Sequence, residues 1–158
     1  MKNDKALRKH LLYLLQEGGA HLDFDTAVKD MPFKLQGQKP KGGEHSPWQL
    51  LEHLRICQRD ILDFCVNPRY VEKKMEEYWP SSAAPPSKKA WDESVAAFRH
   101  DLAQLKGLAG NPSVDLFARI SHGSGQTCLR ELLLVADHNA YHVGQLVAAR
   151  RALGSWKG

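Results

Sequence analysis

Hydrophobic residues recur every three or four positions along four stretches of the chain, which is the spacing of one face of an α-helix. The first stretch covers residues 4–17 and is stopped by the glycine pair 18–19. Its apolar face carries Leu7, Leu11, Leu14 and Leu15. A shorter helix is predicted over residues 23–31 with Asp23 as its N-cap, and the glycine-, proline- and lysine-rich residues 32–45 are predicted to form a loop.

The second long helix has the clearest start signal in the chain. Ser46 is a favoured N-cap, Pro47 suits the first helical position, and Gln49 completes a capping box. The helix is predicted over residues 46–66, because the Asn-Pro pair at 67–68 ends it. Its inward stripe consists of Leu50, His53, Leu54, Cys57, Ile61, Phe64 and Cys65.

Two further long helices follow a connection over residues 68–87, whose second half is too rich in proline for regular structure. The third helix is predicted to open at Ser87 and to end at Gly110, with a seam made by Trp91, Val95, Phe98, Leu102 and Leu105. Residues 114–126 are expected to hold a short extended segment and a tight turn. Thr127 is then the expected N-cap of a last helix that reaches about Leu153.

Four long amphipathic helices without a convincing set of alternating strands predict an all-α protein built as a four-helix bundle. A chain of 158 residues is long enough for one compact core, so we expect a single domain over residues 1–158. The long connections leave room for crossovers between the helices.

Composition narrows the class of protein. Hydrophobic residues make up 42% and charged residues 25%, which is ordinary for a globular protein, and no apolar run approaches the length of a membrane span. The apolar run 11–15 is too short for a secretion signal, so we expect a cytoplasmic protein. The net charge of +4 comes from basic residues interleaved with acidic ones, which argues against a nucleic-acid partner.

The candidate chemistry begins with two histidines four residues apart, His138 and His142, in the last predicted helix. Residues at this spacing lie next to each other on one helix face, so two imidazoles can converge on one ion. The alternative is that one ring is a hydrogen-bonded core residue and the other lies at its edge. His53 shifts the balance toward a metal site, because it lies within the inward stripe of the second helix and three buried imidazoles are costly without a cation.

Other metal motifs are excluded by the residues present. Asn139 stands where a zincin peptidase needs glutamate, and no helix supplies the Glu-x-x-His pairs of a ferritin-like di-metal centre. A mononuclear three-histidine site with open positions is therefore the interpretation that fits. Further residues that could line such a site are Tyr141, Gln145, Cys57 and His45.

Three segments together resemble the DinB/YfiT-like superfamily of metal-dependent proteins: SPWQLLEHL (46–54), AAFRHDL (96–102) and ADHNAYHVGQL (136–146). The resemblance covers about residues 5–153 and implies an up-down-down-up four-helix bundle. It also implies one divalent ion held by the histidines that match His53, His138 and His142. Members with known activities include thiol-dependent S-transferases and an isomerase, and dimers are common among them.

From these observations we expect an enzyme that uses one divalent ion to activate a low-molecular-weight thiol, or second a water, against an electrophilic substrate. Zinc or nickel is the leading candidate ion, with iron or manganese next. No carboxylate stands out as a general base, which favours the thiol. The alternative is a non-catalytic stress-response or interaction protein with a structural or vestigial site, which a fourth ligand such as Cys57 or His45 would favour.

Overall fold

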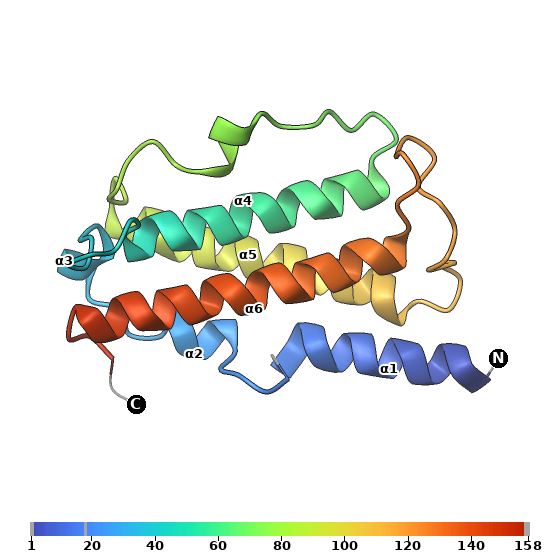
Figure 1. Cartoon of the computed structure of the whole chain (residues 1–158), viewed down its shortest axis with the longest axis horizontal. Coiled ribbons are helices and arrows are strands. Elements are labelled where there is room, and N and C mark those ends of the chain that lie inside the picture. The colour runs from blue at the N-terminus through green and yellow to red at the C-terminus, as the bar shows by residue number, and fades with distance from the viewer. Residues whose placement is uncertain (1, 18, 157–158) are drawn as a thin grey trace.

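Four long helices make up most of the fold, which a computed structural model describes for residues 2–17 and 19–156. They are α1 (Lys2–Glu17), α4 (Pro47–Val66), α5 (Lys88–Gly110) and α6 (Cys128–Ala152). Figure 1 shows α1 and α6 running toward one end of the long axis, while α4 and α5 run toward the other. The prediction of an all-α protein is confirmed, because the described residues contain no strand and only one isolated bridge, between Arg119 and Thr127.

The helix boundaries follow the capping residues that the sequence offers. At the start of α4 the Ser46 hydroxyl accepts from the amide of Gln49, and the Gln49 side chain accepts from the amide of Ser46, which is a complete capping box. Ser87 and Thr127 cap α5 and α6 with the first of these two bonds, because their hydroxyls accept from the amides of Ala90 and Arg130. These three predicted starts are confirmed.

The shorter elements differ from the prediction in extent. Asp23 caps α2 (Phe24–Val28), but this helix ends three residues earlier than expected. A four-residue helix, α3 (Phe33–Gln36), lies inside the predicted loop, and a 3-10 turn, η1 (Met75–Tyr78), lies inside the connection after α4. Both are single turns, too short to produce a recognisable hydrophobic period.

The core runs the length of the bundle in two sections. Figure 1 shows α2 lying below one half of α6 and α1 below the other half. One hydrophobic cluster joins α2 to α4, α5 and α6, and includes Trp48, Leu54, Phe98 and Leu146. The other joins α1 to the same three helices, and includes Leu11, Leu62, Leu105 and Leu132.

One residue of the predicted α1 face is not in the core. Leu14 keeps 41% of its surface exposed, whereas Arg8 on the same helix is buried. Arg8 is buried because its guanidinium donates hydrogen bonds to the carbonyls of Ala109, Asn111 and Val114, where α5 ends. The prediction for Leu14 was wrong because the buried face of α1 also includes Arg8. The helix is turned so that Arg8 reaches the end of α5, and Leu14 lies at the edge of that face.

The connection between α4 and α5, residues 67–87, returns along the outside of α4 (Figure 1). We call it the strap. It is fastened near its end by the Ser46 hydroxyl, which donates to the carbonyl of Ala83. Within the described part of the chain, none of the helices has the length and apolar character needed to cross a membrane.

Candidate metal centre

Three histidine rings meet between α4 and α6. His53 comes from the middle of α4, and His138 and His142 come from successive turns of α6. The Nε2 atom of His53 lies 3.1 Å from Nε2 of His142 and 3.2 Å from Nε2 of His138. The structure therefore brings the three predicted ligands to one point.

Two of the rings are held in a fixed tautomer. Nδ1 of His53 lies 2.8 Å from the carbonyl oxygen of Tyr78, and Nδ1 of His142 lies 2.8 Å from Oε1 of Gln145. Both oxygens can only accept, so each Nδ1 carries the proton and donates it. In the neutral ring, Nε2 is then left with an unshared lone pair.

The environment keeps these rings neutral. Burial, followed by the neighbouring rings of His142 and His53, lowers the pKa of His138 to about 4. Burial and the ring of His53 likewise lower the pKa of His142 to about 4. The pKa of His53 is also lowered, mainly by burial. All three imidazoles are therefore ready to act as ligands at neutral pH.

The donor set fits a divalent ion. The Nε2 lone pairs of His53 and His142 face each other across 3.1 Å. Neither nitrogen carries a proton, so the two cannot form a hydrogen bond with each other. A cation between them would stabilise the pair. Two imidazole nitrogens bound to one ion at about 2.0–2.1 Å are about 2.9–3.4 Å apart for coordination angles between about 90° and 109°. The two observed spacings fall in this range. Nδ1 of His138 is buried and has no hydrogen-bond partner among the described residues.

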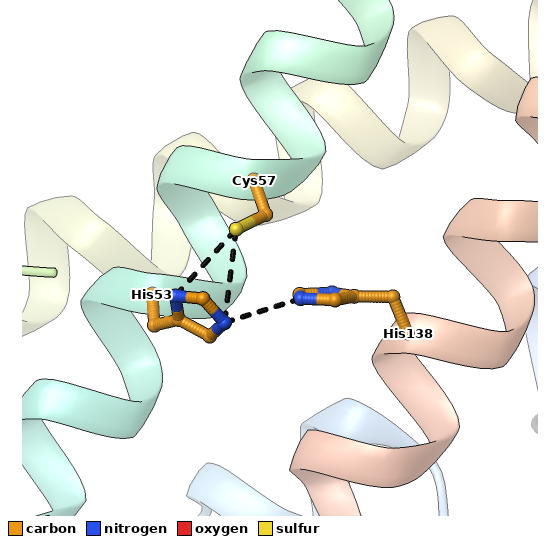
Figure 2. Close-up of side chains that lie close together, drawn as sticks. All are labelled: His53, Cys57 and His138. Atoms are coloured by element: carbon orange, nitrogen blue, oxygen red, sulfur yellow. Dashed lines mark hydrogen bonds between the residues drawn. The ribbon is translucent and has the colours of Figure 1, made fainter. Parts of the chain in front are cut away.

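Cys57, one turn after His53 on α4, is a fourth residue at this point. Figure 2 shows the Cys57 and His53 side chains on α4 turned toward each other and toward His138 on α6. The Cys57 sulfur lies 3.7 Å from Nε2 of His53, and ligand atoms of Cys57, His53 and His138 are all within 4.8 Å of one another. These three residues could also hold a metal ion. Burial and the charge of Asp60 raise the pKa of the Cys57 thiol to about 12.

A cavity of about 820 Å³ opens beside the histidines and extends along the groove between α4 and α6. The strap forms one wall and the turn before α6 forms its far end. Apolar and aromatic side chains line the middle, including Ile61, Phe64, Met75 and Leu134. Polar residues gather at the far end, namely His122, Ser124, Gln126, Arg130 and Glu131. A small organic molecule could therefore reach the histidines with one end and polar groups with the other.

The strap wall is anchored on α4 by a single carboxylate. Oδ2 of Asp60 accepts from the hydroxyls of Tyr70, at 3.0 Å, and Tyr78, at 2.9 Å. Trp79 follows and lies flat on the ring of His53, with the centroids 3.9 Å apart and the planes 4° apart. The strap thus covers the outer face of His53.

The remaining residues predicted to line the site take different places. Cys57 lines the cavity, and Gln145 holds His142 from behind. His45 stacks on the far face of Trp79, with the ring centroids 3.8 Å apart, so it is separated from His53 by the indole. Tyr141 is 64% exposed and touches the His142 ring edge-on, away from the cavity lining.

Several residues of the cavity were not anticipated from the sequence. Asp60 lies seven positions after His53, which is the same face of α4, so helical spacing could have indicated it. Tyr70, Tyr78 and Trp79 lie in an irregular segment that has no such period. His122, in the turn before α6, also lines the cavity, and its Nε2 lies 2.9 Å from the carbonyl of Phe64.

The comparisons with known proteins agree with this architecture. The family model of the DinB superfamily matches residues 20–146, a stretch that includes all three histidines and Cys57. No curated protein and no solved structure was found to match the chain. Because the family model spans well over half of its length, the chain belongs to the DinB superfamily.

Proposed function

We propose that this protein is a divalent-metal-dependent enzyme whose ion is held by His53, His138 and His142. Zinc or nickel is the first candidate, since imidazole ligands suit both ions, and iron or manganese comes next. The observation that carries the proposal is the pair of fixed Nε2 lone pairs on His53 and His142, which face each other in a buried site. Without a cation the two lone pairs that face each other repel, which costs free energy.

The proposed reaction is transfer of a low-molecular-weight thiol to an electrophilic substrate, with metal-assisted hydrolysis as the second choice. A bound divalent ion lowers the pKa of a thiol or a water and so supplies a nucleophile at neutral pH. Hydrolysis would benefit from a free carboxylate as general base. The two buried carboxylates of the cavity are both already paired, Asp60 with two tyrosine hydroxyls and Glu131 with Arg130, which supports the thiol.

The protein's own residues would orient the reactants. The Tyr78 carbonyl and Gln145 fix two of the histidine rings, and Trp79 shields one ring face from water. The apolar middle of the cavity would bind the body of a substrate, and Arg130 and Glu131 would bind its polar end. The up-down-down-up order and the homodimer that the family resemblance implies belong to this proposal, and the directions of α1, α4, α5 and α6 support the former.

A second candidate function rests on Cys57. If its thiolate joins the three histidines, the site has four protein ligands and no open position, which is typical of structural zinc sites. The sulfur lies close enough for this, 3.7 Å from Nε2 of His53. The protein would then be a non-catalytic stress-response or interaction protein that is stabilised by its ion.

Metal content of the purified, untagged protein tests the proposal. After chelation and reloading with zinc, we expect about one ion per chain in the wild type and in the variant His100→Ala, because His100 is exposed on α5. The variants His53→Ala and His138→Ala should lose the ion. Equal metal content in all four proteins would rule out the three-histidine site.

Loading the same proteins with cobalt(II) separates the two candidate functions. A thiolate ligand produces a sulfur-to-cobalt charge-transfer absorption, whereas imidazole ligands do not. We expect the wild-type spectrum to match that of Cys57→Ala, with an open position that responds to added thiol. A charge-transfer band that disappears only in Cys57→Ala, and not in Cys65→Ala, would favour the closed structural site.

A further inference from the structure

Tyr78 is the one described residue that contacts both His53 and Asp60 through separate groups. Its backbone carbonyl accepts from Nδ1 of His53 at 2.8 Å, and its hydroxyl donates to Oδ2 of Asp60 at 2.9 Å. His53 and Asp60 lie seven residues apart on the same face of α4, about 10 Å along the helix axis. Tyr78 therefore lies along α4 and is attached at both ends.

The side chains around Tyr78 show that these contacts hold it in place. His53 and Asp60 are each 8% exposed, so each hydrogen bond of Tyr78 is made to a buried partner on α4. The neighbouring Trp79 is stacked on His53 with nearly parallel planes. At the start of η1 the Glu77 carboxylate accepts from the amide of Lys74, and the middle residues of this single turn are exposed. At its other end, which carries the Tyr78 carbonyl, the contacts of Tyr78 and Trp79 with α4 hold the turn against the bundle.

We propose that Tyr78 is a positioning residue of the metal centre: its hydroxyl, anchored on Asp60, places its carbonyl so that His53 keeps the proton on Nδ1 and presents Nε2 to the ion. The inference rests on the proposed metal centre for its functional meaning. Outer-shell partners of this kind fix the tautomer and the orientation of a metal-binding imidazole.

Tyr70 supplies a matched control. Its hydroxyl donates to the same Oδ2 of Asp60 at 3.0 Å, and it lies in the same strap and lines the same cavity, but it has no contact with a histidine of the metal centre. The variants Tyr78→Phe and Tyr70→Phe each remove one hydroxyl and leave the ring and the backbone. A purely structural role for these hydroxyls predicts the same result for both.

Zinc affinity, measured by competition with a chromophoric chelator, is the first readout. We expect Tyr78→Phe to weaken zinc binding by about tenfold, the lower end of the range for outer-shell partners, and Tyr70→Phe to stay within about twofold of the wild type. The ligand-field spectrum of the cobalt-loaded protein should change in Tyr78→Phe alone. Equal affinities in the two variants would overturn the proposal.

Nitrogen-15 spectra of the histidine rings, recorded on metal-free protein, test the same idea without an ion. We expect the wild-type and Tyr70→Phe proteins to hold His53 as the Nδ1–H tautomer, and Tyr78→Phe to populate the other tautomer. A wild-type His53 with its proton on Nε2 would refute the positioning role. If the wild type binds no metal but the tautomer shifts as expected, the positioning role stands and the proposed function fails.

Discussion

A buried imidazole gains a proton only at a cost, because the charged ring loses its hydration. His138 and His142 carry this cost together, since each ring also lies beside another that would repel a second positive charge. Their ring centroids are 4.5 Å apart. The same arrangement that keeps the nitrogens free for an ion therefore makes the metal-free protein sensitive to acid.

We expect the free energy of unfolding of the metal-free protein to fall as the pH is lowered from about 6.5 to about 4. The folded pKa values of His138 and His142 are about 4, whereas the unfolded rings titrate near their ordinary value of 6.5. Between these values the unfolded chain binds more protons, so stability is full above pH 6.5 and is lost toward pH 4. Urea titrations at a series of pH values measure the slope.

The double variant His138→Gln with His142→Gln serves as the control for this slope. Glutamine does not titrate, so the variant should show a shallower loss of stability over the same range. An unchanged slope would mean that other groups, such as the buried carboxylates, cause the acid sensitivity.

At the scale of the helical elements, what the sequence can predict depends on whether a residue's partner lies in the same helix. The stripe of α4 and the spacing of His138 and His142 were enough to predict that these rings meet, because helix geometry decides which residues share a face. Gln145, one turn from His142, follows from the same rule. Tyr78 and Trp79 could not be predicted, since an irregular strap has no period and its path is decided by contacts with α4.

In the packing of α1, Arg8 is another residue whose partners lie outside its own helix and so could not be predicted. Periodicity places it on α1 but cannot show that its guanidinium reaches the carbonyls of Ala109, Asn111 and Val114, at and just after the end of α5. We expect Arg8→Ala to lower the free energy of unfolding by about 2–4 kcal/mol, because buried carbonyls lose charged donors. The exposed neighbour Lys9 gives the comparison, and Lys9→Ala should change stability by less than about 0.5 kcal/mol. Chemical denaturation of both variants measures the difference, and similar losses would contradict the anchoring role of Arg8.

On the scale of the whole molecule, the cavity connects the histidines to the opposite end of the groove between α4 and α6. Its walls come from α4, the strap, the turn before α6, and α6 itself. In the proposed function, substrate and metal would occupy different parts of the same groove, so their binding should respond to different substitutions.

Filling the cavity tests this separation. Leu134 lines the cavity, whereas its neighbour Leu133 is 47% exposed on the outside of α6. We expect Leu134→Trp to retain one ion per chain but to weaken the response of the cobalt spectrum to added glutathione by on the order of tenfold, about 1.4 kcal/mol. Leu133→Trp should behave as the wild type. Loss of the ion from Leu134→Trp, or equal thiol responses, would contradict separate sites.

The three-histidine site is complete only when separate segments of the chain have come together. His53 is 85 residues from His138 along the chain, and the carbonyl that orients it comes from a segment made between the two. The pair on α6 could bind an ion as soon as that helix forms, but the third nitrogen is added only when α4 packs on α6, and its orientation depends on the strap. An ion held by all three would therefore join α4 to α6 in the finished bundle, and its binding free energy would add to the stability of that bundle.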